Sequence, residues 1–319
     1  MTTVDADAVA RAAEVLRRGG LVAFPTETVY GLGADASQPA AVRKIFAAKG
    51  RPADHPLIVH LAEAAQLTQW AVAIPAIAWR LAEAFWPGPL TLVLKRRPDI
   101  NDVVTGGQDT IGLRIPSHPV AQALLRGFGG GVAGPSANRF GRISPTTAAH
   151  VRAEFGDSLD VILEGGQSDV GIESTIVDLS GEAPALLRPG HVSAEALARV
   201  LGTAVRSPTS MSPRVSGSLE SHYAPRTQAV LATADAIDVA WSDPGAPLGV
   251  LSRRARPAGD RPGLWVTAPG DPDGYAHDLY ASLRRLDEGG CDRILVETLP
   301  DGPEWSAIRD RVGRATAAS

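Results

Sequence analysis

Cysteine is almost absent from this 319-residue sequence, in which Cys291 is the only one. A single cysteine excludes a disulfide framework within the chain and a zinc cluster built from cysteines. The seven histidines show no HExxH or similar metal-binding spacing. We therefore expect no metal site made by the protein alone, and the cytoplasm is the simplest compartment.

Long apolar runs and a strong charge of one sign are also missing. Charge or proline breaks every apolar stretch well before the roughly 20 residues that a membrane helix needs. The first residues, MTTVDADAVARAAEVL, contain early acids and no signal core. The net charge of -4 and the 5% aromatic content give no broad basic field for long nucleic acid. We expect no membrane segment and at most a weak contact with tRNA through a local basic patch.

Lysine is rare as well. It occurs only at Lys44, Lys49 and Lys95, and arginine supplies the rest of the 31 basic residues. Lys49 is therefore informative, because the chain uses arginine almost everywhere else.

The composition that remains is that of a globular protein. Hydrophobic residues make up 44% and charged residues 21%, and the length suits two domains. Up to residue 205, helical and strand patterns alternate irregularly, with intervals often too short for a crossover helix. This favours an α/β (α+β) domain with a mixed sheet over a doubly wound nucleotide fold. The patterns predict helices over 5–18, 39–48, 75–86, 118–126 and 193–201, a helix starting within 144–156, and strands at 56–61, 90–96, 110–116, 159–165 and 174–180.

The chain changes character after residue 205. Residues 206–221 are rich in serine and proline without apolar periodicity, as in a linker or mobile loop. Beyond them, strand-like runs such as QAVLAT and DRILVET alternate with helical segments, which is typical of a small parallel α/β domain. The predicted boundaries are 1–205 for a catalytic domain, 206–225 for a linker or lid, and 226–319 for the second domain.

A first group of candidate residues lies in PTETVYGLG (25–33) and AAKGRP (47–52). Lys49 and Arg51 flank Gly50 at an expected helix end, so both side chains could face one anion. An ammonium and a guanidinium together would neutralise a triphosphate and a leaving pyrophosphate. Alternatively, both cations only complement the helix C-terminus that Gly50 caps.

Two further groups lie in GPSAN (134–138) and in GIESTIVDLS followed by ALLRPG. Ser136 and Asn138 offer polar groups on the same side of an extended segment. Ser174 begins an apolar strand and Arg188 ends one, so each could meet a ligand. Ordinary turn and strand-end polarity explains these residues equally well. His60 follows an apolar run, where a histidine is more often a satisfied core residue.

Ten motifs, taken together and in order, resemble those of the YrdC-type threonylcarbamoyl-AMP synthases in their long, two-domain form. They are PTETVYGLG, KGRP, PLIVH, WPGPLTLVL, IGLRIPSHP, GPSAN, SPT, GIESTIVD, LLRPG and SHYAP. The resemblance is dense over about residues 8–202, and SHYAP (221–225) is similar to the family's junction motif. Each motif alone is weak, but ten in order make chance agreement implausible.

The resemblance implies a fold and a reaction. The fold is a twisted, open, mixed sheet with surrounding helices, followed by a Rossmann-like parallel α/β module that lacks a phosphate-binding glycine signature. The reaction joins L-threonine, bicarbonate and ATP, with Mg²⁺ carried on the nucleotide, and releases pyrophosphate. A separate tRNA threonylcarbamoyltransferase then uses the threonylcarbamoyl-AMP to modify adenosine beside the anticodon.

The resemblance also implies roles for individual residues of this chain. L-Threonine would be held by Thr28, His60, Arg114, Ser174 and the backbone at Gly134. Residues around ATP would be Lys49, Arg51, His55, Thr110, Ser136, Asn138, Ser144, Arg188 and, from the linker, Tyr223. Lys49, Arg51, Ser136 and Asn138 would lie closest to the chemistry. His55 stands where the family often has asparagine.

Three other interpretations deserve comparison. A nucleic-acid-binding module would need more basic charge and more aromatic residues. The YrdC-like part of carbamoyltransferases that mature hydrogenases is accompanied by zinc-finger cysteines, which this chain lacks. A nonspecific Rossmann nucleotide binder would rest on the C-terminal part alone.

Overall fold

The structure, a computed structural model, describes residues 3–217, 219, 221–258 and 261–317. The chain divides into two compact units. The first comprises Met1–Phe140, Pro145–Asp169 and Glu173–Ser218, and the second comprises Gly141–Ser144, Val170–Ile172 and Leu219–Ser319. Two short segments that precede residue 205 thus belong to the second unit, which the sequence pattern did not indicate.

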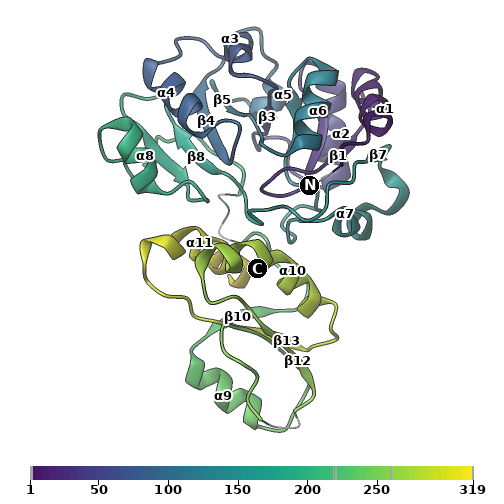
Figure 1. The fold of residues 1–319 in the computed structure, drawn as a ribbon, viewed down its shortest axis with the longest axis vertical. Helices are drawn as coiled ribbons and strands as arrows, with labels where there is room; N and C mark the ends of the chain where they lie inside the picture. Colours follow the sequence, from purple (N-terminus) through teal and green to yellow (C-terminus); the bar gives the residue numbers. More distant parts are fainter. Residues whose placement is uncertain (1–2, 218, 220, 259–260, 318–319) are drawn as a thin grey trace. The chain divides into compact units, whose positions relative to one another are not determined.

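Nine strands of the first unit form one sheet, in the order β7-β1-β2-β6-β3-β5-β4-β8-β9. Figure 1 labels β1, β3, β4, β5, β7 and β8 of this sheet. Three neighbouring pairs are parallel, β1 with β7, β3 with β5 and β4 with β8, and the others are antiparallel. This confirms the expected mixed sheet. The strands are β1 (Val22–Phe24), β2 (Gly31–Asp35), β3 (Ile58–His60), β4 (Leu90–Lys95), β5 (Thr110–Arg114), β6 (Val132–Ala133), β7 (Val161–Ile162), β8 (Thr175–Asp178) and β9 (Ala185–Arg188).

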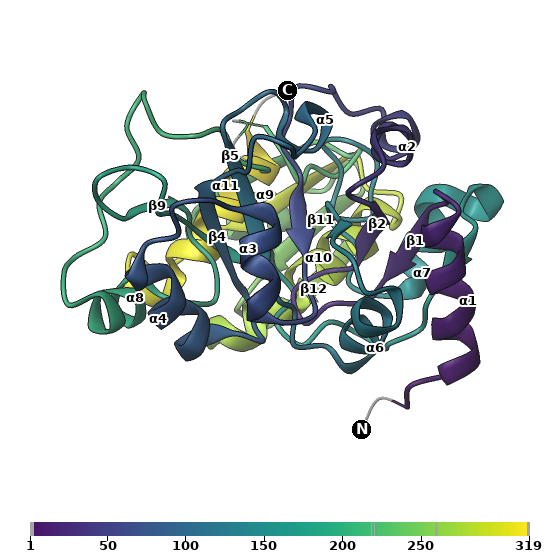
Figure 2. The ribbon, with the colours of Figure 1, turned by 90° about the horizontal axis from the view of Figure 1, so that it is seen from above.

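Helices surround this sheet, and their ends follow local signals in the sequence. Asp5 accepts a hydrogen bond from the backbone N–H of Ala8 and starts α1, and Gly50 ends α2 in the left-handed conformation. The apolar side of α1 packs against α6, with Val9 and Leu16 in one cluster with Leu124 (Figure 2). The helices are α1 (Ala6–Arg17), α2 (Pro39–Lys49), α3 (Leu67–Trp70), α4 (Ala76–Phe85), α5 (Asp102–Thr105), α6 (Pro119–Phe128), α7 (Ala148–Phe155) and α8 (Ala194–Leu201).

A central strand that is covered on both faces of the sheet is apolar at nearly every position. Strand β4 lies between β5 and β8, and its first five residues are all buried, as expected for a central strand covered on both faces. Residues 31–35, for which the sequence patterns predicted no strand, form strand β2. A Cβ atom on Gly33 would lie 2.9 Å from both the Phe24 ring and Val132, so glycine lets β2 pack directly on β1.

The second unit contains a separate four-stranded parallel sheet in the order β10-β13-β11-β12. This confirms the small parallel α/β module. Its elements are β10 (Ala229–Ala232), α9 (Ala234–Ser242), β11 (Leu248–Ser252), β12 (Gly263–Thr267), α10 (Pro272–Asp287), β13 (Arg293–Glu297) and α11 (Ser306–Thr316). Across the part of the chain that the structure describes, no helix combines the length and apolar character needed to cross a bilayer.

Candidate active site

Strand ends of the first unit bring together residues that are far apart in the sequence. Parallel strands β3 and β5 pair His60 with Arg114 at their last residues. Strand β4 runs antiparallel to β5 and parallel to β8, so β4 and β8 both begin near the end of β5. Ser174 directly precedes β8, and its hydroxyl lies 2.8 Å from the hydroxyl of Thr91 near the start of β4. Arg114, His60 and Ser174 therefore lie at one edge of the sheet.

The β1–β2 loop adds hydroxyl groups to this edge. Nη1 of Arg114 donates a hydrogen bond of 2.8 Å to Oγ1 of Thr28. Thr26 donates its hydroxyl proton to the carbonyl of Val29, at 2.6 Å, so Thr28 donates to Oγ1 of Thr26 across 2.8 Å. Because a hydroxyl has one proton and two lone pairs, Thr28 can face a ligand only as an acceptor.

His60 lies in the core of this edge, with only 3% of its surface exposed. Its ring meets the Phe24 ring edge-on at 5.6 Å. Burial and the nearby charge of Arg114 lower its pKa to about 3, so the ring is neutral at physiological pH. Within the described part of the chain, Nδ1 has no hydrogen-bond partner. A Cβ atom on Gly134 would lie 3.0 Å from this nitrogen, so glycine leaves the imidazole more room than another residue would.

Arg188, at the end of β9, is bonded to Ser174. Nε and Nη2 donate to the Ser174 carbonyl at 3.1 and 3.0 Å, and Nη2 also reaches its hydroxyl at 3.2 Å. Both side chains are buried. The structure therefore brings Ser174 and Arg188 into direct contact, although the sequence analysis proposed them for different substrates.

Lys49 points into the protein from the end of α2. Nζ donates to the carbonyl oxygens of Ser136 and Asn138, at 2.5 and 2.6 Å, and only 3% of the residue is exposed. Burial, reinforced by the charge of Arg51, lowers its pKa well below the usual range. Lys49 is thus joined to the GPSAN segment through backbone carbonyls. An ammonium has three donors, and these two contacts leave one for a ligand.

Arg51 turns to a different neighbour from Lys49. Its Nη2 donates to the carbonyl of Pro56 and to the hydroxyl of Ser216, each at 3.0 Å. Nη1 of Arg188 donates to the carbonyl of the same Ser216 at 2.8 Å. Two of the arginines expected around ATP therefore hold the segment that was expected to be a linker or lid.

Residues 214–216 of that segment lie against the sheet face. Val215 packs with Val93 of β4 and Ile176 of β8. A small hollow lies beneath it, lined by residues from several strands and the segment itself, namely Pro56, Leu57, Ile58, Thr91, Val93, Gln108, Thr110, Gly112, Ile176, Arg214, Val215 and Ser216. Of the residues expected around ATP, Thr110 lines this hollow. His55 instead stacks edge-on against Phe140, with ring centroids 5.4 Å apart, and burial together with the charge of Arg51 lowers its pKa.

Ser144 and Tyr223 belong to the second unit. Both are buried. Tyr223 has a left-handed backbone with φ of 61°, uncommon for a residue other than glycine. Its ring lies 5.6 Å from the guanidinium carbon of Arg311 and 5.6 Å from the Tyr280 ring. The contacts of these two residues with ATP stay predictions.

Two residues of the network, Glu27 and Thr91, were not among the candidates expected from the sequence. Glu27 forms a buried ion pair with Arg114 at 2.6 Å, and Thr91 shares the hydrogen bond with Ser174. Their partners lie 87 and 83 positions away along the chain, so spacing could not reveal them. For Glu27, the one local signal was its position between Thr26 and Thr28 in an otherwise apolar segment.

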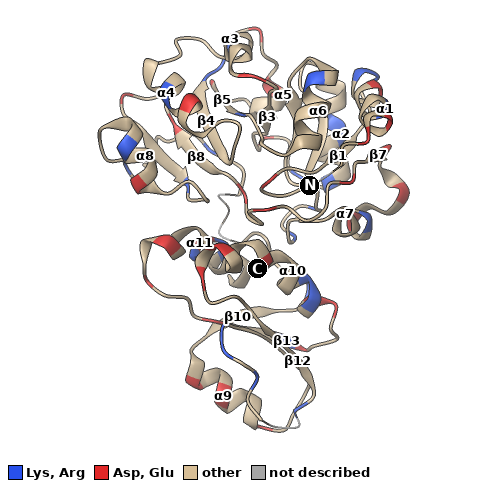
Figure 3. Cartoon of the chain, in the orientation of Figure 1, with Lys and Arg blue, Asp and Glu red and all other residues tan. Residues whose placement is uncertain are grey.

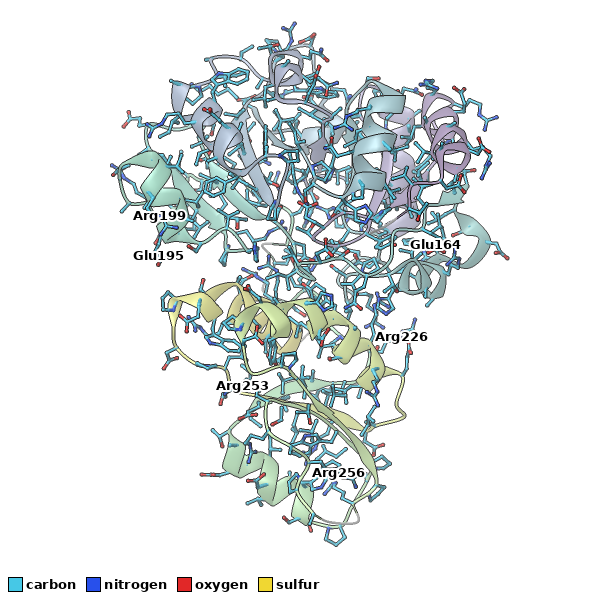
Figure 4. All side chains as sticks on the ribbon, in the orientation of Figure 1. Glu164, Glu195, Arg199, Arg226, Arg253 and Arg256 are labelled. Atoms are coloured by element: carbon cyan, nitrogen blue, oxygen red, sulfur yellow. The ribbon has the colours of Figure 1, made fainter. Side chains whose placement is uncertain are left out.

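Exposed charges of both signs lie over the described part of the chain. Basic and acidic residues are interspersed on the ribbon (Figure 3). Glu164, Glu195 and Arg199 are exposed and point outward (Figure 4), whereas Arg51, Arg114 and Arg188 are buried. Among the residues described, no three His, Cys, Asp or Glu side chains gather closely enough to hold a metal ion.

Comparison with protein families accounts for both units. Residues 14–190 match the family model named for Sua5, YciO and YrdC and described as "Telomere recombination". Residues 192–317 match a model described as "Threonylcarbamoyl-AMP synthase, C-terminal domain".

Individual proteins resemble the chain over nearly its whole length. A protein of Pyrococcus abyssi named "Threonylcarbamoyl-AMP synthase" is 38% identical over 96% of this chain and 93% of its own length. A Bacillus subtilis protein of the same name is 38% identical over 96% and 92%. The crystal structure of P. abyssi Sua5 complexed with L-threonine superposes with a TM-score of 0.89, at 35% identity, over 98% of this chain and 95% of that one. The chain therefore belongs to the threonylcarbamoyl-AMP synthase family, in its two-domain form, and is an enzyme of that type.

Proposed function

We propose that the chain converts L-threonine, bicarbonate and ATP into threonylcarbamoyl-AMP and pyrophosphate. The observation that carries the proposal is the convergence of Arg114, Thr28, His60 and Ser174 at one sheet edge, with Arg188 bonded to Ser174. Guanidinium groups bind both carboxylates and phosphates. An amino acid at Arg114 and a nucleotide at Arg188 would meet beside Ser174.

The reaction needs positioning more than covalent help. The amine of L-threonine attacks bicarbonate and water leaves, giving a carbamate. A carbamate oxygen then attacks the α-phosphorus of ATP, and the bond to pyrophosphate breaks. Holding the reactants in line and compensating phosphate charge supply most of the catalysis for such a transfer.

On the amino-acid side, Arg114 would bind the carboxylate, and Thr28 would accept a hydrogen bond from an N–H or O–H group of the ligand. His60, which is neutral, and Ser174 would complete this part of the site with the backbone at Gly134. Neutral donors and acceptors suit a zwitterion, because they add no net charge to a buried pocket.

On the nucleotide side, cations and small polar groups would surround the triphosphate. Lys49 would use its third N–H donor, while Arg51 and Arg188 would exchange their contacts with Ser216 for phosphate oxygens. The remaining groups proposed around ATP are His55, Thr110, Ser136, Asn138, Ser144 and Tyr223. Mg²⁺ prefers oxygen ligands and often keeps few protein contacts. We therefore treat the ion as part of the Mg·ATP substrate and assign it no residue.

We further propose that residues 206–225 act as a lid over the nucleotide. The contacts of Val215 and Ser216 with the sheet face support this role. Excluding water would protect a mixed anhydride that otherwise hydrolyses. In a Val215→Ser variant, we expect pyrophosphate release to exceed the yield of threonylcarbamoyl-AMP, because the looser segment admits water. Equal yields of the two products, as in the wild type, would argue against a lid.

Pyrophosphate release from ATP tests the proposed reaction. Release should require both L-threonine and bicarbonate, and threonylcarbamoyl-AMP should form in equal amount. An RNA-binding module would release none and would instead shift tRNA in a salt-dependent way. A nonspecific nucleotide binder would bind ATP without needing either partner. Release without L-threonine would contradict the proposal.

The product would then pass to a separate tRNA threonylcarbamoyltransferase, and the cytoplasm is the expected place for this exchange. A weak direct contact with tRNA is part of this proposal. Adding that transferase and tRNA to the assay should move the threonylcarbamoyl group onto adenosine. If threonylcarbamoyl-AMP still forms but its threonylcarbamoyl group does not reach tRNA, only the proposed use of the product by the transferase is contradicted.

A further inference from the structure

The Glu27–Arg114 ion pair is buried at the edge proposed for the amino acid. Each side chain is 5% exposed, and the shortest N–O distance is 2.6 Å. The second oxygen of Glu27 accepts the backbone N–H of Ser117 at 3.0 Å. Both carboxylate oxygens are therefore occupied, and the carboxylate is fixed between β5 and the segment that follows it.

The guanidinium of Arg114 is fixed by three contacts. Nε donates to the carbonyl of Gly88 at 3.3 Å, Nη1 to Thr28 and Nη2 to Glu27. A guanidinium has five N–H donors, so two remain for a ligand, one on each terminal nitrogen. A carboxylate has two oxygens that can accept from both of these donors.

The pair also changes the charge that a ligand meets. A lone buried guanidinium would attract any anion, including bicarbonate, phosphate and pyrophosphate. With Glu27 beside it, the charges of the pair cancel, and binding depends on directed hydrogen bonds instead. L-Threonine carries no net charge at neutral pH, so a neutral pair suits it better than a full positive charge.

We propose that Glu27 is a positioning residue for L-threonine: it orients the guanidinium of Arg114 toward the carboxylate and cancels its charge, so that inorganic anions do not compete. This inference rests on the proposed function. It adds a residue to the amino-acid site and a reason for selectivity between an amino acid and the anions of the same reaction.

The decisive variant is Glu27→Gln, which keeps the size of the side chain and removes its charge. We expect the KM for L-threonine to rise at least tenfold and the KM for ATP to stay within twofold. Inorganic phosphate, tested at saturating ATP, should become a competitive inhibitor against L-threonine. A residue with only a structural role would not produce phosphate competition.

Glu27→Asp separates the orientation of the Arg114 guanidinium from the cancellation of its charge. It also tests the proposal if Glu27→Gln does not fold. This variant keeps the negative charge but withdraws the carboxylate by one methylene group. Its KM for L-threonine should rise while phosphate still does not compete. Phosphate competition in Glu27→Asp, or an unchanged KM for L-threonine, would overturn the proposed division of roles.

A matched control is Glu164→Gln on the first unit's surface. Glu164 pairs with Arg152, but the two side chains are 65% and 52% exposed (Figure 4). Both KM values should stay at the wild-type level, because solvent screens such a pair. Equal rises of both KM values in Glu27→Gln would overturn the role of Glu27.

Calorimetric titration of wild-type protein with L-threonine distinguishes the two possible failures. A wild type that neither binds L-threonine nor releases pyrophosphate overturns the proposed function, and the role of Glu27 with it. A wild type that does both, beside a Glu27→Gln variant without selective loss, overturns the role of Glu27 alone.

Discussion

The two units bury charged side chains in different surroundings. In the second unit, the buried Glu297 accepts hydrogen bonds from the hydroxyl of Ser252 and the N–H of Arg253, and the buried Arg311 pairs with Asp310 at 2.7 Å. In the first unit, Lys49 donates to two backbone carbonyls, and Arg188 donates to the carbonyls of Ser174 and Ser216. Carboxylates cancel charge, whereas carbonyls satisfy donors without cancelling it. Except for Arg114, which pairs with Glu27, these cations of the first unit therefore keep their charge for an anionic substrate, whereas Asp310 neutralises Arg311 in the second unit.

Removing one cation from each unit should give the largest difference in catalytic activity between two variants. We expect Arg51→Ala to lower kcat/KM for ATP by about 10²–10³-fold, the usual loss when one transition-state donor is removed. Arg254→Ala in the second unit breaks a partly exposed pair with Asp238, so turnover should stay within about twofold. Pyrophosphate release as a function of ATP concentration measures both. Similar losses in the two variants would remove the distinction between the units.

The burial of neutral His60 should lower the stability of the folded protein in acid. Its pKa is about 3 in the folded chain and 6.5 when unperturbed, so between these values the unfolded chain holds the proton and the folded chain does not. Stability is therefore lost as the pH falls from 6.5 toward 3. By pH 4 we expect His60 to account for a loss of about 3 kcal/mol, at 1.36 kcal/mol per pKa unit.

Urea titrations at pH 7 and pH 4 test this expectation. A His60→Gln variant should lose less stability on acidification than the wild type does. His277 on α10 of the second unit has a side chain that is 37% exposed, and His277→Gln should leave the acid sensitivity unchanged. Identical acid sensitivity in His60→Gln and the wild type would contradict a protonation cost at His60.

Replacing one buried serine in each unit should give the smallest effects and the most specific comparison. Ser174→Ala should raise the KM for L-threonine about tenfold and affect ATP less, because the hydroxyl lies at the amino-acid edge. Ser252→Ala in the second unit removes the hydrogen bond to Glu297 and should cost about 1–2 kcal/mol of stability without changing either KM. Equal rises of both KM values in Ser174→Ala would count against its assignment to L-threonine.

Much of the architecture was readable from local patterns. The helix expected over 5–18 is α1 (Ala6–Arg17), and that over 193–201 is α8 (Ala194–Leu201), because caps and apolar periodicity are local properties. The strand expected at 159–165 shortens to β7 (Val161–Ile162). Strand β2 was missed because the packing of its glycines against Phe24 depends on a tertiary contact.

The site was only partly readable. The motifs grouped Arg114, Thr28 and Ser174, and the structure places them at the same strand ends, although their contacts with L-threonine stay predictions. The motifs did not predict that Arg188 would be bonded to Ser174. The sequence suggested that Lys49 and Arg51 bind one anion together, because Gly50 alone separates them. The left-handed Gly50 turns the chain between them, and the two side chains have different partners.

The sequence by itself determined the family, the mixed and parallel sheets, and the kinds of side chain available for chemistry, because periodicity, capping and ordered motifs are written along the chain. Only the tertiary structure decided which side chains meet. Thr91 meets Ser174 because β4 and β8 lie side by side in the sheet, and Glu27 meets Arg114 because the β1–β2 loop reaches the end of β5. The same folding buries these groups, and burial sets their charge and their hydrogen-bonding capacity.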